Sequence, residues 1–403
     1  MTSRGTERST GPGTRRARCR VAIVGGGPAG CATALELARR GTGDVVVVEA
    51  GDYSAVRVGE SIPPDTRRHL DRLGVLDAFL AASHAPCYGS TSAWGDRRPG
   101  HNDFLFNPLG HGWHLDRGRF DSFLADAARD TGARLLTGTR LEVGHLGGPR
   151  ADAGGDGERG RGGGGITLKL RRPGGGTTAL EADFAVDASG HRAILARALG
   201  AGKRYLDRLI CANGFFLLPP GREFQHVTLL EAVEYGWWYA ARVPGGRVAV
   251  AVASDPAILK DRGLSRENPW LEALAATEHI APALAGAGYQ PRSLRAWPAH
   301  SFRLDRVVGK GWLAAGDAAS AYDPISAQGV FKALGGGIAA GTAVHSHLAG
   351  DAEALPTYAD TVQRDFQVYT ANRGHFYAQE RRWPQASFWS RRGSEAGQGP
   401  AAA

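Results

Sequence analysis

Residues 21–49 read VAIVGGGPAGCATALELARRGTGDVVVVE, and this stretch decides the fold. The apolar residues 21–24 predict a buried strand, the glycine loop 25–30 opens a helix rich in alanine and leucine, and Val45–Val48 predicts a second strand. Together they form one compact βαβ unit. The loop has the G-x-G-x-x-G spacing that lets a backbone approach a pyrophosphate at a helix N-terminus, and Glu49 follows about 20 residues later, where an acid accepts hydrogen bonds from a ribose. The stretch therefore predicts a dinucleotide-binding unit, against the alternative of a glycine turn without a ligand.

The composition is that of a large globular protein. The chain has 403 residues, 42% hydrophobic and 22% charged, which is enough for two structural domains. No uninterrupted apolar run approaches the roughly 20 residues of a transmembrane helix. The net charge of +8 comes mainly from arginine, partly in the tails, and no recognition motif accompanies it. We therefore expect neither a transmembrane segment nor a nucleic-acid partner.

Cysteine usage and the N-terminal arginines bear on the compartment. The four cysteines have no C-x-x-C pair and no metal-like spacing, so neither a disulfide framework nor a metal site is expected. Arg15 and Arg16 could be mistaken for a twin-arginine signal, but the apolar stretch behind them leads directly into the glycine loop. A cytoplasmic protein is therefore expected.

Three further segments complete the pattern. Residues 144–177 are dominated by glycine and arginine between two strand-like stretches, which predicts a hairpin with an overgrown loop. Residues 211–253 hold several β-rich stretches and predict an antiparallel sheet. A long helix rich in alanine and glycine is expected from about Val330 to Leu348.

Five motifs in order resemble one family, over roughly residues 20–350. Besides the glycine loop, they are residues 58–64 (VGESIPP), 116–121 (DRGRFD), 183–190 (DFAVDASG), and 311–330, which contains GWLAAGDAA and DPISAQGV. The chain resembles the FAD-dependent aromatic hydroxylases, flavin-dependent halogenases and geranylgeranyl-reductase-like flavoproteins. The resemblance implies FAD as cofactor and assigns it the following residues: Gly25, Gly27, Pro28, Ala29, Gly30, Glu49, Glu60, Ser61, Arg117, Asp187, Gly316, Asp317, Pro324, Gln328, Gly329 and Val330.

The family assigns distinct roles to the last motif. It implies that Asp317 binds the ribityl hydroxyls and that the turn from Pro324 to Gly329 places helix N-terminal amides beside the flavin. A reduced flavin carries negative charge, which an oriented helix dipole with free N–H groups stabilises. An ordinary buried aspartate and a helix cap are the plain alternatives.

The predicted fold is α/β: a Rossmann-like FAD-binding domain with a parallel sheet, an inserted antiparallel substrate domain and C-terminal helices. The expected boundaries are a flexible basic leader (1–19), a discontinuous FAD-binding domain (20–56, 100–200 and 305–350), a substrate domain (57–99 and 201–304) and a C-terminal helical and aromatic extension (351–403).

Two absences favour hydroxylation over halogenation. Halogenases of the family place a lysine shortly after the Gly-Glu-Ser segment, whereas the first lysine of this chain is Lys169. Their Trp-x-Trp-x-Ile-Pro pattern is also not met by residues 236–244 (GWWYAARVP). The resemblance therefore implies a monooxygenase that acts through a peroxide at the flavin C4a atom, with halogenase, isoprenoid-type reductase and non-catalytic flavin-binding maturation protein as alternatives.

The candidate catalytic residues lie on the substrate side. Trp237, Trp238 and Tyr239 could stack an aromatic ring, although core packing explains them equally well, and His114 is a candidate proton carrier. Together with residues 59–64 (GESIPP) and 236–239 (GWWY), the aromatic and basic stretch 376–389 resembles the LodB-like flavoproteins of tryptophylquinone biogenesis. An aromatic small molecule or a tryptophan-containing partner protein is therefore the expected substrate. The plain alternative for the stretch 376–389 is a C-terminal helix that packs over the FAD domain. The electron source is left open between NAD(P)H and a separate flavin reductase.

Overall fold

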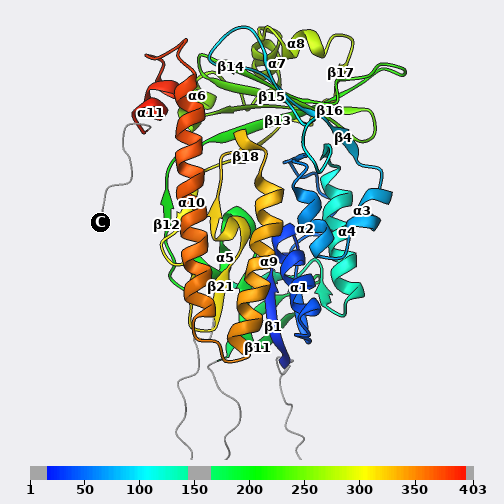
Figure 1. Cartoon of the computed structure of the whole chain (residues 1–403), viewed down its shortest axis with the longest axis vertical. Helices are drawn as coiled ribbons and strands as arrows, with labels where there is room; N and C mark the ends of the chain where they lie inside the picture. Colours follow the sequence, from blue (N-terminus) through cyan, green and yellow to red (C-terminus); the bar gives the residue numbers. More distant parts are fainter. Residues whose placement is uncertain (1–15, 144–164, 396–403) are drawn as a thin grey trace, which may run out of the picture.

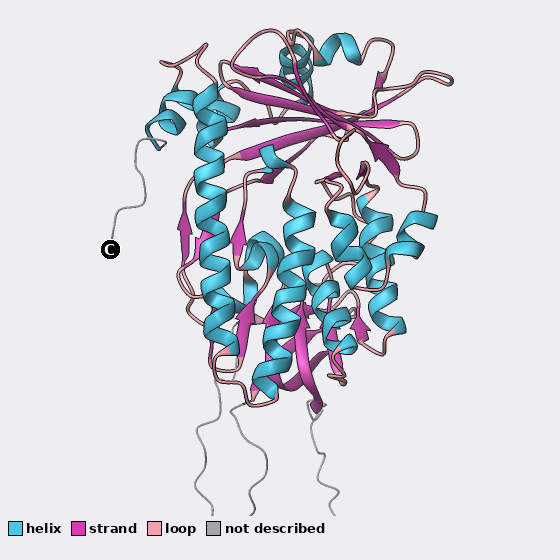
Figure 2. Cartoon of the chain, viewed as in Figure 1, coloured by secondary structure: helices cyan, strands magenta, loops and turns pink. Residues whose placement is uncertain are grey.

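Two eight-stranded sheets form the two ends of the molecule in the computed structural model, which describes residues 16–143 and 165–395 (Figure 1). Helices cover the lower sheet and cap the upper one, and one long helix runs beside both (Figure 2). No helix within the described ranges is long and apolar enough to cross a membrane.

The lower sheet has a parallel centre in the order β21-β11-β1-β2-β8, as the βαβ pattern predicts. β20 extends it antiparallel at one edge, and β10 and β9 add an antiparallel ribbon on β11. The β9–β10 pairing confirms the predicted hairpin, whose loop at 144–164 lies outside the described residues. The strands are β1 (Arg16–Val24), β2 (Val45–Val48), β8 (Arg134–Leu136), β9 (Arg140–Leu141), β10 (Ile166–Arg171), β11 (Thr177–Asp187), β20 (Val308–Gly309) and β21 (Trp312–Ala314).

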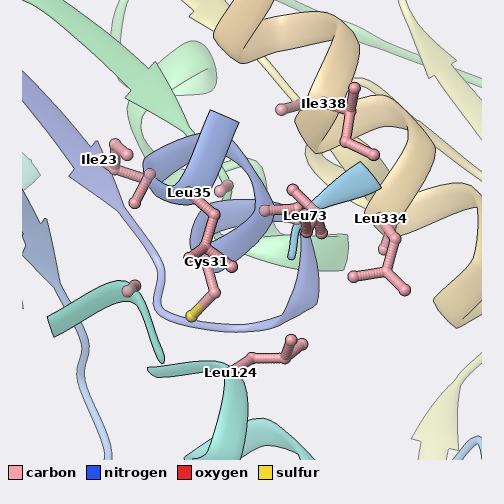
Figure 3. Packing of buried hydrophobic residues seen from close by; sticks show 14 of the residues in the cluster. Ile23, Cys31, Leu35, Leu73, Leu124, Leu334 and Ile338 are labelled. Carbon is pink, nitrogen blue, oxygen red and sulfur yellow. The ribbon is translucent and has the colours of Figure 1, made fainter. Parts of the chain in front are cut away.

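Small residues let two helices pack closely on this sheet. A Cβ added at Gly337 of α9 would lie 2.4 Å from the carbonyl oxygen of Ala29 in α1, so only glycine fits there. Thr33 of α1 donates a hydrogen bond across the same contact to the Gly337 carbonyl, at 3.1 Å. Figure 3 shows the apolar core around this pair, with Leu35, Leu124 and Leu334 converging from three helices. The helices of this half are α1 (Pro28–Arg39), α2 (Thr66–Arg72), α3 (Leu76–Ala81), α4 (Arg117–Asp130), α5 (Ile194–Ala198) and α9 (Gly329–Leu348).

The upper sheet is antiparallel except where β14 pairs with β5. Its order is β17-β13-β16-β15-β14-β5-β6, with β18 also paired to β13, which confirms the sheet predicted over residues 211–253. Helices α6 (Pro256–Asp261), α7 (Glu267–Ala275) and α8 (Ile280–Ala283) lie at this end of the molecule (Figure 1). The strands are β5 (Gly89–Ala93), β6 (Gly100–Asp103), β13 (Ile210–Leu217), β14 (Thr228–Val233), β15 (Gly236–Val243), β16 (Arg247–Ser254), β17 (Gly288–Tyr289) and β18 (Arg295–Pro298).

Two short sheets and the C-terminal helices join the halves. The short sheets are β3 (Ser61–Ile62) with β7 (Gly112–His114) and β4 (Ala85–Cys87), and β12 (Lys203–Tyr205) with β19 (Phe302–Leu304) and β22 (Ser320–Ala321). Helix α10 (Ala354–Gln379) touches both large sheets, because Tyr358 donates to the carbonyl of Ala314 in β21 while Tyr377 accepts from Trp237 in β15. Helix α11 (Ser387–Glu395) packs beside its end (Figure 1).

Several expected boundaries differ from the structure. β1 begins at Arg16 rather than Arg20, because residues 16–19 continue the pairing with β11. The boundary expected at residue 57 precedes α2 and α3, whose apolar residues Leu70 and Phe79 belong to the core of the lower half. The boundary expected at residue 100 cuts the β5–β6 hairpin of the upper sheet. The sequence therefore predicted the positions of helices and strands along the chain better than it predicted which half of the molecule each of them joins.

Candidate active site

The glycine loop is shaped for a close backbone approach. Gly25 has φ +110°, and a Cβ there would lie 2.3 Å from the carbonyl oxygen of Ala188, so the loop rests directly on the turn after β11. A Cβ on Gly27 would meet only one side-chain atom, Nη1 of Arg57 at 3.9 Å. Gly27 is the N-cap of α1, and no side chain caps that helix. The first-turn amides of Ala29 and Gly30 are thus left available to an anion.

Glu49 is held firmly at the end of β2. Its carboxylate accepts hydrogen bonds from the backbone N–H of Gly26 at 2.8 Å and of Gly51 at 2.9 Å. Arg57 pairs with Glu49 at 3.2 Å and with the buried Asp121 at 2.8 Å. The sequence motifs did not include Arg57, whereas Asp121 is the last residue of the motif 116–121.

Arg117 organises the turn before Glu60. Its Nε and Nη2 atoms each donate to Asp121 at 3.1 Å, and Nη1 donates to the carbonyls of Val58 and Gly59. Asp116 caps α4 by accepting from the N–H of Arg119. The motif 116–121 therefore positions the 58–61 segment.

The Asp187 side chain accepts hydrogen bonds from the turn that follows β11 and from helix α5. The side chain is fully buried at the end of β11. Its oxygens accept from the backbone and hydroxyl of Ser189 and from the N–H of Ala196. These bonds shape the turn that supports the glycine loop. Asp187 therefore supports the glycine loop, and its expected contact with the cofactor stays a prediction.

Asp317 lies between two basic side chains after β21. Lys332 of α9 pairs with one oxygen at 2.7 Å, and His191 approaches the other at 3.3 Å. Burial alone would raise the pKa of Asp317, but the Lys332 charge and the His191 contact hold it well below its usual range. Gly316, with φ +59°, packs on Ala29, which brings this turn against the first turn of α1. Sequence reasoning missed Lys332 and His191, although both flank recognised motifs.

The next turn leads into α9. Asp323 caps the short 3₁₀ helix η4 (Pro324–Ser326) through the N–H of Ile325, and Ala327 takes a left-handed conformation, φ +51°. Helix α9 then begins at Gly329, behind the N-cap Gln328, without a side-chain cap, and Val330 is buried in the core of the lower half. The α9 N-terminus is therefore another place with free amides beside Asp317.

A basic cavity of about 600 Å³ opens beside His191. It lies where the turn after β11 meets β12 and β18. The polar and aromatic side chains of its lining are His191, Arg192, Arg197, Lys203, Tyr205 and His300. None of its lining residues is acidic, so the cavity suits an anionic ligand.

A polar cluster lies where β3 and β7 meet the upper sheet. The Ser61 hydroxyl lies 2.8 Å from that of Tyr239 and 3.1 Å from that of Thr228, and Nε2 of His114 is 3.1 Å from the Thr228 hydroxyl. His114 is fully buried, and burial lowers its pKa to about 3. It is therefore neutral at physiological pH, which makes it a hydrogen-bond partner of this cluster rather than a cationic acid.

Alternation along β15 divides the three expected aromatic residues. Trp237 and Tyr239 point toward the C-terminal helices and Ile325, whereas Trp238 packs on Trp270 at 5.3 Å under α7. Successive side chains of a strand face opposite sides. Trp238 is thus a core residue on the outer face, and its expected place in the substrate site is corrected.

The C-terminal aromatic stretch is folded into the protein. Tyr377, Phe388 and Trp389 are buried against Trp237, and Arg392 is 2% exposed. Phe376 is the large apolar residue of this stretch that remains exposed, at 46%. The alternative of packing within the chain therefore holds, although most of the packing is on the upper sheet rather than over the FAD half.

The comparisons agree with this geometry. The chain belongs to the family described as FAD binding domain, which matches residues 18–366. Within it the chain groups with the LodB-like flavoproteins: it is 30% identical to LodB of Marinomonas mediterranea, named as an FAD-dependent oxidoreductase, over 92% of this chain and 95% of that protein.

Two solved structures share the fold over 93% of this chain. The flavin-dependent halogenase CmlS is 25% identical with a TM-score of 0.79, and the match covers 68% of its chain. QhpG, a peptidyl tryptophan dihydroxylase essential for tryptophylquinone cofactor biogenesis, is 25% identical with a TM-score of 0.67 over 79% of its chain. The protein is thus an FAD-dependent oxidoreductase of the halogenase and hydroxylase class, and its cofactor is FAD.

Replacing Glu49 should weaken FAD binding without unfolding the protein. We expect Glu49→Ala to bind FAD about 10 to 100-fold more weakly, the effect of losing a charged hydrogen-bond partner of about 1–3 kcal/mol. Titration of the apoprotein with FAD, followed by flavin fluorescence, measures the change. Glu278→Ala, at a half-exposed carboxylate paired with Arg97, is the matched control and should bind like the parent. Equal affinity of the Glu49 variant and the control would contradict the assignment.

Proposed function

We propose that the chain is an FAD-dependent monooxygenase that hydroxylates an aromatic ring, and that this ring is a tryptophan side chain of a partner polypeptide. Bound FAD, once reduced, supplies the electrons that activate dioxygen. The glycine loop and Glu49 would hold its adenosine and pyrophosphate end, and Asp317 with the α9 N-terminus would hold its flavin end. Uncapped amides at both helix N-termini support this placement.

One observation carries hydroxylation over halogenation: no lysine reaches the polar cluster of Ser61, His114, Thr228 and Tyr239. All five lysines of the chain lie within its described part. Three are engaged elsewhere: Lys169 with Glu142, Lys203 with the carbonyl of His191, and Lys332 with Asp317. The other two, Lys260 and Lys310, are exposed. Arginine cannot replace the missing amine, because its guanidinium stays protonated.

The tryptophan substrate is supported by the inner face of the upper sheet and by the relatives. Trp237 and Tyr239 line that face opposite Ile325 of the turn from Pro324 to Gly329, and aromatic faces suit an indole ring. QhpG, whose fold this chain shares, acts on a peptidyl tryptophan. The basic cavity next to Asp317 further favours NADH or NADPH as the electron donor, because the phosphate groups of both are anionic.

The experiment supplies the enzyme with FAD, oxygen, chloride and bromide, and a tryptophan-containing partner polypeptide encoded near its gene. Mass spectrometry of the polypeptide should show a gain of one or two oxygen atoms. A halogen isotope pattern would contradict hydroxylation, and a gain of hydrogen alone would indicate a reductase. In parallel, NADH or NADPH alone is compared with reduced flavin from a separate reductase. Turnover only with the separate reductase would contradict the role of the basic cavity.

A further inference from the structure

The loop that follows β6 holds two large apolar side chains in solvent. In this loop, residues 104–110, Leu105 is 75% exposed and Phe106 is 92% exposed. Tyr88 adds a ring that is 50% exposed, and its carbonyl accepts from the N–H of Phe104 at 2.8 Å. Neighbouring apolar side chains on a surface commonly mark a place where another molecule binds. We refer to Tyr88, Leu105 and Phe106 as the Phe106 patch.

Hydrogen bonds within the loop hold this exposed arrangement. The carboxylate of Asp103 accepts from the N–H of Leu105 at 2.9 Å, and the side chain of Asn107 accepts from the N–H of Leu109 at 2.9 Å. From helix α2, Arg67 donates to the carbonyl of Leu109 at 3.2 Å. The loop is therefore a built turn that presents its two apolar side chains outward.

Two arginines give the patch a basic rim. Arg67 contacts the loop, as described above. On the other side Arg242 donates to Nε2 of His226 at 3.1 Å, and the ring of His226 lies 5.9 Å from that of Tyr88. Within residues 16–143 and 165–395, neither arginine forms an ion pair with a carboxylate. An acidic group on a bound molecule would complement this rim.

The strand beside the patch has an open edge. β6 is the last strand in the order of the upper sheet, where it pairs antiparallel with β5. Its outer edge pairs with no other strand of the described chain, and all four of its residues are exposed. An open edge presents backbone donors and acceptors that an extended polypeptide can pair with. The edge therefore favours a polypeptide as the bound molecule.

A short segment of chain connects the patch to the polar cluster of the candidate site. The loop continues through His111, whose ring lies 5.7 Å from that of Tyr88, into β7. β7 pairs with β3 and places His114 opposite Ser61. Both residues belong to the polar cluster. A polypeptide on the patch would thus lie next to the elements that carry the candidate site.

We propose that the Phe106 patch and the open edge of β6 form the docking surface for the partner polypeptide. The docked segment is extended and carries apolar and acidic side chains. This assignment rests on the proposed function, since the partner is the polypeptide that bears the substrate tryptophan. Docking on the patch lets the enzyme recognise the polypeptide by a segment other than the tryptophan itself.

The test measures how tightly the FAD-loaded enzyme binds the tryptophan-containing polypeptide encoded near its gene, by biolayer interferometry. We expect the double variant Leu105→Ser/Phe106→Ser to bind about 10 to 100-fold more weakly, because exposed apolar anchors carry much of the affinity of an interface. Arg242→Gln should bind about 3 to 10-fold more weakly and depend less on salt. Val368→Ser is the matched control, at an apolar side chain of α10 that is 57% exposed, and should bind like the parent.

FAD content and melting temperature show whether each variant is folded. If the double variant lost FAD, Phe106→Ser alone, at the most exposed of these side chains, would carry the test. No binding by the parent, or parental affinity in the patch variants, would overturn the proposal. A parent dimer that the patch variants convert to monomers would also overturn it, because the patch would then bind a second copy of this chain.

The binding assay needs no turnover, so it is independent of the proposed hydroxylation. Oxygen gain in a polypeptide that binds the patch variants and the parent equally would leave hydroxylation standing and refute the docking surface. Binding that depends on the patch, without oxygen gain in the polypeptide, would refute hydroxylation alone.

Discussion

Asp317→Ala is expected to be purified with little or no bound FAD and without activity. The carboxylate is held ionised between Lys332 and His191 at the end of β21, which leaves it poised to bind a hydroxyl-rich chain. Its loss removes charged hydrogen bonds worth about 1.5–3 kcal/mol each and leaves two basic groups facing each other. Since ribityl binding involves more than one such bond, we expect FAD affinity to fall by at least about 100-fold.

The FAD content of the purified protein, read from its absorption spectrum, measures this effect. Asp317→Asn keeps the shape and one acceptor oxygen and should lie between the parent and the alanine variant. Asp126→Ala removes an exposed carboxylate that pairs with its helix neighbour Arg129, and its flavin content should be unchanged. Full flavin content in Asp317→Ala would show that the flavin end of the site lies elsewhere.

Local patterns were readable from the sequence because they depend on neighbours along the chain. The strand, glycine loop and helix of residues 21–39 follow from hydrophobic periodicity and glycine spacing, and so does the long helix α9. Residues 65–80 have apolar side chains at helical spacing, but they form two helices, α2 and α3, that are separated at Gly74, which has φ +73°. A single glycine in an amphipathic pattern does not reveal whether the chain will turn there.

Contacts between distant segments could not be predicted in the same way. Trp237 and Trp238 look equivalent in sequence, and only the packing of α7 on one face decides which of them is core. The stretch 376–389 has a composition that fits either a partner surface or a buried strap, because tryptophan, tyrosine and arginine serve both. The stretch is buried because Asp323, about 50 positions away in the sequence, accepts hydrogen bonds from Tyr377 and from the nearby Arg373.

A buried ion-pair network connects α10 to the turn that begins at Pro324. Arg373, 3% exposed, pairs with Asp323 at 3.4 Å and with Asp207. Tyr377 donates to the same Asp323 carboxylate at 2.7 Å and accepts from Trp237 at 3.0 Å. Asp323 immediately precedes the Pro324 turn. The position of that turn therefore depends on a helix that begins after the recognised motifs.

Arg373→Ala is consequently expected to give the largest loss of stability, about 3–5 kcal/mol, because it removes the arginine that pairs with the buried carboxylate of Asp323. Asp207 also loses this arginine, although it keeps Arg392 at 3.7 Å. Tyr377→Phe removes one hydroxyl and should cost about 1–3 kcal/mol. Arg381→Ala, at an exposed arginine near the end of the same helix, is the matched control and should change stability by less than about 0.5 kcal/mol. Urea unfolding of the FAD-loaded proteins gives the free energies, and the flavin content at each denaturant concentration shows whether cofactor release accompanies the loss of α10. If Arg373→Ala unfolded at the same urea concentration as Arg381→Ala, the network would contribute no stability. If Arg373→Ala unfolded at a lower urea concentration but kept its flavin until the global transition, α10 would stabilise the fold without holding the Pro324 turn.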